Sequence, residues 1–151
     1  MAATIVIGLG YGDEGKGMSV LCETNRYKRM GMPTLNVRFN GGPQAAHNVR
    51  LVRDGVMLHH THSQFGSGTL LGARTVITDG MLFDPIRLEP EACHLYDLMG
   101  ENVMDRLYVD GSCNVIFPTH VVANRMIERE RGASRHGSTG SGIGVARNCQ
   151  D

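Results

Sequence analysis

An aspartate and a lysine stand inside a glycine-rich loop near the start of the chain, Gly10-Tyr-Gly-Asp-Glu-Gly-Lys-Gly17. The spacing of its glycines matches a dinucleotide fingerprint, and with Lys16 it also matches a phosphate loop whose final Ser or Thr is replaced by Gly17. A dinucleotide site needs an acidic residue after the second strand, where this sequence has Arg38-Phe39-Asn40. A phosphate site needs backbone N–H groups, a helix N-terminus and a lysine. The loop therefore favours phosphate binding over a turn that only packs a helix on a strand.

Asp13 is the most informative residue of this loop. A carboxylate would be repelled by bare phosphate, so it makes sense there if it holds a cation or takes a proton from a bound substrate. Because Gly17 lacks the hydroxyl that usually binds magnesium, Asp13 is the obvious replacement oxygen donor. Glu14 has two open interpretations: a second catalytic acid, or a solvated residue at the positive end of a helix.

Histidines and cysteines give weaker signals. His59, His60 and His62 are clustered, and His60 and His62 lie on one strand face, but the nearby sequence has no Cys or carboxylate to complete a tetrahedral site. We therefore expect a half-exposed strand and no metal there. The four cysteines contain no C-x-x-C pair, and with no expected signal peptide they indicate free thiols in a reducing cytoplasm.

Composition limits the class of protein. The 151 residues suit one domain, residues 1–151, and 41% hydrophobic residues suffice for a core. Fifteen Lys and Arg balance fifteen Asp and Glu, which argues against binding to nucleic acid or a membrane surface through bulk positive charge. No run of 18 apolar residues occurs, which excludes a transmembrane helix. The 20 glycines cluster beside apolar segments, which indicates backbone that approaches a ligand closely.

Strands alternating with helices predict an α/β fold with a mainly parallel sheet and a phosphate-loop-like strand–loop–helix start. The first strand, helix and second strand imply a right-handed βαβ crossover. Asp54-Gly55 predicts a hairpin turn, and Asp84-Pro85 predicts the start of a helix that ends at Gly100. The expected strands are 4–9, 35–39, 49–52, 56–60, 75–78, 107–110 and 115–117. The expected helices are 18–30, 85–99 and 119–131, and 132–151 is expected to be loop.

Three segments, taken in order, resemble the adenylosuccinate synthetase family. They are Gly12-Asp-Glu-Gly-Lys-Gly17, Arg38-Phe-Asn-Gly-Gly-Pro-Gln-Ala-Ala-His47-Asn48 and Gly137-Ser-Thr-Gly-Ser-Gly-Ile-Gly144, and together they cover essentially the whole chain. The resemblance implies a GTP- and Mg²⁺-dependent ligase of AMP biosynthesis that joins IMP and L-aspartate through 6-phosphoryl-IMP. It also implies a cytoplasmic homodimer for the complete enzyme.

The same resemblance implies a role for individual residues. Catalysis falls to Asp13, His47 and Lys16, and Mg²⁺ binding to Asp13 and Ala46. The implied GTP contacts are Gly12, Asp13, Glu14, Gly15, Lys16, Gly17, Met18, Ala46, His47 and Asn48. The implied IMP contacts are Asp13, Glu14, Gly15, Lys16, Gln44, Ala45, Ala46, His47 and Thr139. Without the motif, His47 would be interpreted as a loop histidine packed against the hairpin.

The sequence also departs from the family pattern. Pro43, Gln44 and Ala46 stand where His, Asn and Gly are common, and Ser141 replaces a frequent arginine. Ala46 can still offer its carbonyl to magnesium if its backbone avoids a conformation that only glycine tolerates. These changes suggest a divergent branch, and relatives in the superfamily use dGMP to make 2-amino-2'-deoxyadenylosuccinate. Both acceptors therefore stay open.

Length is the larger departure. The family's enzymes are usually more than twice as long, and their guanine-base and aspartate sites lie beyond the part that these residues match. We therefore expect an N-terminal nucleotide-binding portion that is inactive alone. A non-catalytic nucleotide-binding fragment remains an alternative, whereas an unrelated phosphate-loop hydrolase is disfavoured by Asp13 and Gly17.

Overall fold

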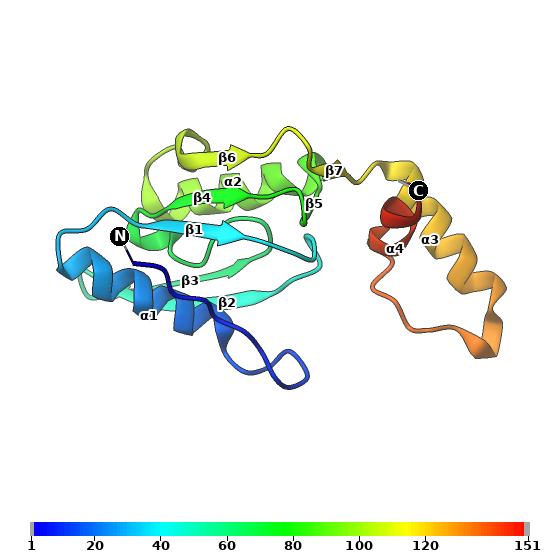
Figure 1. Ribbon diagram of the computed structural model, residues 1–151, viewed down its shortest axis with the longest axis horizontal. Helices are drawn as coiled ribbons and strands as arrows, with labels where there is room; N and C mark the ends of the chain where they lie inside the picture. The colour runs from blue at the N-terminus through cyan, green and yellow to red at the C-terminus, as the bar shows by residue number, and fades with distance from the viewer. Residues whose placement is uncertain (1, 150–151) are drawn as a thin grey trace.

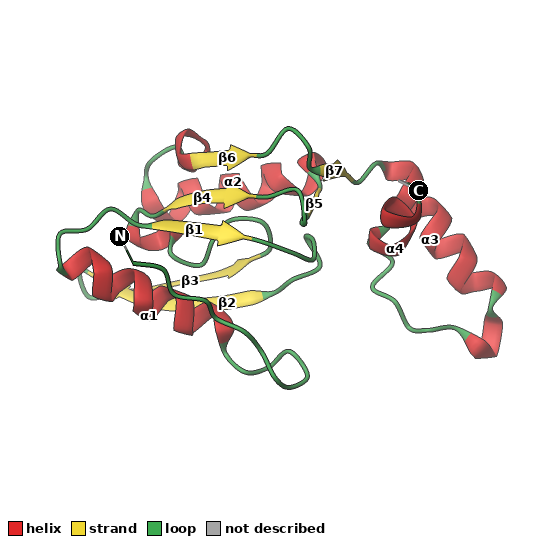
Figure 2. Cartoon of the chain, in the orientation of Figure 1, coloured by secondary structure: helices red, strands yellow, loops and turns green. Residues whose placement is uncertain are grey.

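The computed structural model describes residues 2–149 and has an α/β architecture, as the sequence predicts (Figures 1 and 2). Its strands are β1 (Leu35–Arg38), β2 (His47–Arg53), β3 (Val56–His62), β4 (Arg74–Ile77), β5 (Leu82–Phe83), β6 (Leu107–Val109) and β7 (Asn114–Val115). Its α-helices are α1 (Lys16–Arg29), α2 (Pro85–Met99), α3 (Pro118–Glu130) and α4 (Ile143–Asn148). Short 3₁₀ helices cover Thr69–Leu71, Val103–Arg106 and Gly132–Ser134.

The central sheet is parallel, with strand order β1-β4-β6. A second parallel pair joins β5 to β7, and β2 and β3 form an antiparallel hairpin. The main core lies between the hairpin, α1 and α2, where Val49, Phe65 and Leu95 are almost completely buried. The parallel sheet confirms the predicted fold class.

The predicted first strand is not formed. Residues 4–9 are described but adopt no strand, and Ile5, Ile7 and Leu9 are 86%, 70% and 91% exposed. The segment is tied to α1 instead, because the Thr4 hydroxyl bonds to Glu23 and Tyr27. Without backbone pairing to β1, the expected βαβ crossover is absent from the described residues. The prediction of a buried strand from the apolar pattern was therefore wrong, because no neighbouring element covers this segment.

The hairpin confirms the strongest local prediction. Asp54 and Gly55 both have positive φ, 51° and 77°, which the tight turn between twisted strands requires. The pairing extends beyond the predicted ends, with His47 opposite His62 and Arg53 opposite Val56. The turn therefore fixes a register that carries two histidines to the same end of the hairpin.

Helix α2 begins and ends at the predicted residues. The Asp84 carboxylate accepts from the backbone N–H groups of Ile86 and Arg87, and Gly100 ends the helix with a φ of 69°. Such a side-chain cap typically stabilises a helix by about 1 kcal/mol. Cap and stop signals are local, so the sequence shows them directly.

The C-terminal part differs from prediction in two elements, the short 3₁₀ helix Gly132–Ser134 and α4. Helix α3 is close to the predicted 119–131, but the expected loop contains α4. Gly142, with a φ of 76°, starts α4, and Ala146 packs with Leu82 and Ile116 in a small second core. A six-residue helix of this kind is held by tertiary packing, which a single sequence does not show.

Two further expectations concern cysteines and membranes. Cys22, Cys93, Cys113 and Cys149 are all free thiols, as predicted. Of the helices within residues 2–149, none combines the length and apolar character needed to cross a membrane.

Candidate functional site

The first glycine loop leads into the N-terminus of α1, which has no side-chain cap. Gly12 and Gly15 adopt positive φ values of 104° and 75°, and Gly15 is the residue before the helix, with no side-chain cap. The N–H groups of the first helical turn therefore have no intrahelical acceptor and are not capped by a side chain. With the helix dipole, they form a suitable site for an anion.

Gly17 has a packing reason to lack a side chain. A Cβ placed there would lie 3.0 Å from the Asn48 carbonyl oxygen and 3.0 Å from the His47 Cβ. The start of α1 therefore rests directly on the start of β2. The departure from Ser or Thr in the phosphate-loop pattern follows from this close approach.

Lys16 and Glu14 form an ion pair within the loop. The Lys16 Nζ donates to the Glu14 carboxylate at 2.6 Å, and the Gly10 N–H donates to the same group at 2.7 Å. The Lys16 hydrogen bond, followed by backbone N–H groups of the loop, lowers the pKa of Glu14 to about 2. Glu14 is thus an ionised partner of Lys16 in this unliganded loop.

Asp13 and Ala46 offer oxygen atoms that are not blocked by protein partners. Asp13 is exposed and makes no side-chain hydrogen bond or ion pair with the described residues. Ala46 is exposed, and among described non-glycine residues only Asp54 has a positive φ. Ala46 therefore meets the condition set by replacing a common glycine.

Two cations, Arg38 and Lys16, act on His47. It opens β2, next to the start of α1, and is half-buried. Burial, followed by the charges of Arg38 and Lys16, lowers the pKa of His47 to about 4. The imidazole is neutral at neutral pH, and the positive groups around it make this corner attractive to phosphate.

The second and third glycine segments meet each other. A Cβ on Gly42 would lie 2.7 Å from the Ile143 side chain, so α4 packs against the loop that carries Gln44. The Ser141 hydroxyl accepts from Arg87 at 3.0 Å and from the Thr139 hydroxyl at 2.9 Å. The structure thus places the segment of Thr139 beside the second loop.

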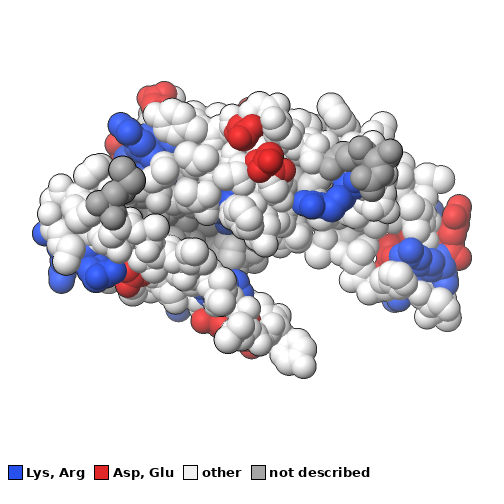
Figure 3. Space-filling model, viewed as in Figure 1, with Lys and Arg blue, Asp and Glu red and all other residues white. Residues whose placement is uncertain are grey.

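The space-filling view shows where the glycine segments lie on the molecular surface. In Figure 3 this face is hollowed between the protruding first loop and the C-terminal helices. Acidic and basic groups are interspersed on this face, and neither sign forms a continuous patch. The glycine segments therefore border an open recess.

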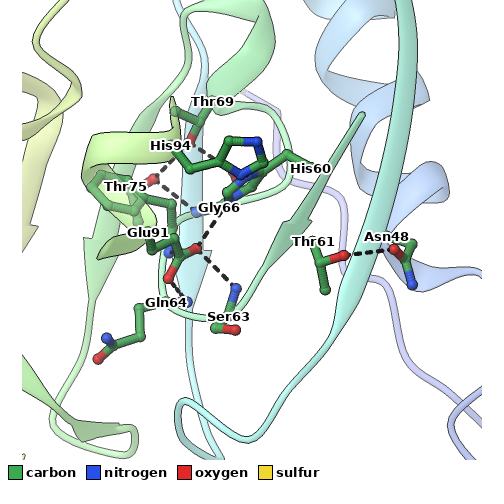
Figure 4. Close-up of polar contacts among 11 residues, drawn as sticks. Asn48, His60, Thr61, Ser63, Gln64, Gly66, Thr69, Thr75, Glu91 and His94 are labelled. Carbon is green, nitrogen blue, oxygen red and sulfur yellow. Dashed lines mark hydrogen bonds and ion pairs between the residues drawn. The ribbon is translucent and has the colours of Figure 1, made fainter. Parts of the chain in front are cut away.

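The exclusion of carboxylates around the histidines was wrong. His60 and His62 are 3% and 0% exposed and lie on the buried face of β3, whose other face is exposed, so the strand is half-exposed as expected. Helix α2 supplies Glu91 to the same cluster and His94 to its rim (Figure 4). Glu91 falls between Leu88 and Leu95 on the apolar face of α2, and this spacing was the available sequence signal. Sequence reasoning also missed Arg38 as a cation beside His47.

Fold and loop together define an α/β protein whose helix N-terminus, lysine and histidine form one corner. The adenylosuccinate synthetase family model matches residues 5–150, so the chain belongs to the adenylosuccinate synthetase family. The chain is 32% identical over 97% of its length to adenylosuccinate synthetase of Azobacteroides pseudotrichonymphae. It is likewise 32% identical over 95% of its length to that of Parabacteroides distasonis.

The chain spans about a third (32%) of the length of each of these two relatives. A solved structure of fully ligated adenylosuccinate synthetase from Plasmodium falciparum has the same fold, with a TM-score of 0.75 and 23% identity. The match covers 93% of this chain and 30% of the other. These matches show that the chain belongs to the adenylosuccinate synthetase family and shares its fold.

Proposed function

We propose that this chain forms the GTP- and IMP-binding part of a ligase that joins IMP and L-aspartate into adenylosuccinate. The observation that carries the proposal is the corner where the uncapped end of α1 and Lys16 meet His47 beside Arg38. Backbone N–H groups and two cations there suit the phosphates of a nucleotide. The family membership supports a cytoplasmic homodimer for the complete enzyme.

The proposed GTP contacts are Gly12 to Met18 and Ala46 to Asn48. The proposed IMP contacts are Asp13 to Lys16, Gln44 to His47 and Thr139. Contact between Gly42 and Ile143 supports this grouping, since it brings the second and third segments together.

In the proposed chemistry, Asp13 takes the proton from N1 of IMP, so that O6 attacks the γ-phosphorus of GTP and GDP departs. Lys16 and the first-turn N–H groups of α1 stabilise the negative charge that develops during this transfer. His47, neutral before nucleotide binds, donates its ring N–H toward the departing phosphate side. The aspartate amine then displaces the phosphate from C6, which completes the C–N bond.

Magnesium fits the donors that this corner offers. The Asp13 carboxylate and the Ala46 carbonyl are hard oxygen ligands, and the backbone of Ala46 has no positive φ. When bound, the ion would neutralise phosphate charge. A requirement for Mg²⁺ is therefore part of the proposal.

Measurements of GTP and IMP binding test which nucleotide the first loop contacts. We expect Lys16→Ala to weaken GTP binding by about tenfold or more, because it removes a charge-assisted contact of about 1.5–3 kcal/mol. IMP binding should fall less, and Arg29→Ala, an exposed charge near the other end of α1, should change neither. NMR titration of the chain detects weak binding. Equal losses for both nucleotides would reassign the loop, and no GTP binding by the unaltered chain would contradict the proposal.

Ligase chemistry needs a second test, because the chain spans about a third of its relatives. Residues 5–150 would replace the matching segment of one bacterial synthetase in a chimaera, assayed with GTP, aspartate and either IMP or dGMP. We expect IMP to be used. Gln44 stands where Asn is common and lies against Gly42, which gives a reason to include dGMP as an acceptor. If a folded chimaera used dGMP and not IMP, dGMP would become the proposed acceptor.

A further inference from the structure

A cluster of buried imidazole and carboxylate groups lies behind the hairpin, outside the proposed nucleotide corner (Figure 4). His60 and His62 alternate along β3 and therefore face the same side of the strand. Helix α2 covers that side with Glu91 and, one turn later, His94. His60, His62 and Glu91, called here the histidine cluster, are 3%, 0% and 8% exposed.

Three ring nitrogens of the histidine cluster have no hydrogen-bond partner among residues 2–149. They are Nε2 of His60 and both Nδ1 and Nε2 of His62. Buried polar atoms are nearly always hydrogen-bonded, and each one left unpaired destabilises the fold. Three orphaned nitrogens beside a carboxylate are therefore a feature that needs a ligand.

We propose that His60, His62 and Glu91 bind one divalent transition-metal ion of the Zn²⁺ class. One ligand atom from each residue lies within 4.8 Å of the others, and His60 Nε2 is 3.7 Å from a Glu91 oxygen. Zinc holds such atoms at about 2.0–2.2 Å, which places tetrahedral neighbours about 3.4 Å apart. The ligand atoms must therefore move closer together on binding, and no hydrogen bond among the described residues holds the His62 ring nitrogens in place.

Glu91 and His94 are arranged as supporting groups. The Glu91 carboxylate accepts three backbone N–H bonds, from Ser63, Gln64 and Phe65, which fix its position. Oε1, the oxygen 3.7 Å from His60 Nε2, accepts two of them and Oε2 accepts one, so the lone pair that remains for a metal is on Oε2. The Nδ1 atoms of His60 and His94 are 2.9 Å apart. When His60 donates this proton to His94, its Nε2 lone pair is free for the ion.

Ligand type separates this site from the proposed magnesium site. Two imidazoles and one carboxylate suit zinc and its neighbours, whereas magnesium prefers oxygen ligands. Arg38 is close enough for its positive charge to act on His62, and the negative charge of Glu91 partly offsets it. The cluster is closed to substrates by burial, so the ion is structural.

Such an ion would brace the end of the hairpin that carries His47. His62 and His47 are cross-strand partners, and the ion would tie β3 to α2 directly behind them. The site therefore positions the phosphate corner without touching the nucleotide. The inference does not depend on the proposed ligase chemistry, because metal binding is measured without substrate.

Direct titration tests the site. The metal-free chain is titrated with Zn²⁺ by calorimetry and with Co²⁺ by visible absorption. We expect one ion per chain, a loss of at least about 100-fold in affinity for His62→Gln and about tenfold for His94→Gln. His59→Gln is the matched control, because His59 is exposed on the opposite face of β3. No binding by the unaltered chain, or equal affinity in His62→Gln, would overturn the proposal.

A measurement on the unaltered chain covers the case in which His62→Gln fails to fold. Imidazole ¹⁵N resonances are recorded with and without Zn²⁺ after assignment of the seven histidines. We expect the ring nitrogens of His60 and His62 to shift. Shifts confined to His120 and His136, which lie in the C-terminal part, would show surface binding and overturn the proposal.

Discussion

Asp13 and Lys16 stand three positions apart in one loop, but only Lys16 has an oppositely charged partner among the described residues. Lys16 is held by Glu14 at 2.6 Å, whereas the Asp13 carboxylate has no partner among the described residues. Once phosphate is bound at this helix end, it repels an unpaired carboxylate unless a cation or a substrate proton lies between them. The proposed chemistry therefore depends on Asp13 as general base and magnesium ligand.

Asp13→Asn tests this role in the chimaera. The amide keeps the size of the side chain but cannot accept a proton, so we expect turnover to fall by about 100–10,000-fold. IMP binding should change little. Asp97→Asn, an exposed carboxylate on α2, is the matched control. Turnover within about tenfold of the unaltered chimaera would remove the general-base role.

The sequence predicted some site residues and missed others for a physical reason. Asp13 and Lys16 lie within one short loop, so their spacing is visible along the chain. Glu91 reaches the histidines from an element about 30 positions away, with Ser63 and Glu91 separated by 28 residues. A contact of that range depends on how α2 packs, which no local pattern encodes.

At the scale of elements, α1 and β2 are in close contact in the proposed site. Gly17 lies against backbone atoms of His47 and Asn48, and backbone yields less readily than a flexible side chain. This contact sets how far the helix N-terminus lies from His47, the proposed catalytic histidine. A small change at Gly17 should therefore affect both stability and nucleotide binding.

Gly17→Ala measures that contact. The added methyl group would lie 3.0 Å from its neighbours, and we expect a loss of about 1–2 kcal/mol in the free energy of unfolding in urea. Gly144→Ala is the control, since a Cβ there meets open space within α4 and should be neutral or stabilising. Unchanged stability in Gly17→Ala would mean that α1 can retreat from β2.

The loop after α3 depends on one carboxylate. Glu128 pairs with Arg131 at 2.6 Å and accepts from the N–H groups of Gly137 and Ser138. Desolvation raises its pKa, but the hydrogen bonds from Arg131 and the loop outweigh it, so the pKa of Glu128 is lowered from 4.5. A lowered folded pKa means that this contribution is full above pH 4.5 and is lost as the pH falls through the lowered value.

We therefore expect protonation of Glu128 in acid to break its hydrogen bonds with the Gly137 and Ser138 N–H groups and to loosen this loop. Amide shifts of Gly137 and Ser138 should be constant from neutral pH down to about the pKa of a free glutamate, 4.5, and move toward unstructured values below it. Glu128→Gln should produce the acid-like shifts at neutral pH. Glu130→Gln, an exposed neighbour on α3, should not. Shifts independent of pH would show that packing alone holds the loop.

Local signals account for the elements that were predicted well. Asp54-Gly55 and Asp84 with Gly100 carry their turn and cap chemistry in adjacent residues, so hairpin and α2 follow from the sequence. Residues 4–9 and α4 show the opposite case. The first has strand composition without a strand partner, and the second has weak composition but a packing surface on Leu82 and Ile116.

For the whole molecule, exposure is the dominant feature of the proposed site. Residues 10–15 are all exposed, and Ile5, Ile7 and Leu9 before them are also uncovered. The recess in Figure 3 is open on the side between the first loop and the C-terminal helices. Water therefore reaches the groups that would act on the nucleotide.

This openness predicts that the 151-residue chain alone does not catalyse the ligation. Phosphoryl transfer to IMP needs fixed charges in a site that excludes water, because water weakens their interaction and competes as an acceptor. The described corner supplies phosphate contacts but leaves Asp13 exposed. Adenylosuccinate formation from IMP, GTP and aspartate, or its analogue from dGMP, should stay at background, while a matched bacterial synthetase turns over under the same conditions. Steady multiple turnover by the isolated chain would show that loop closure on the nucleotide is enough to exclude water.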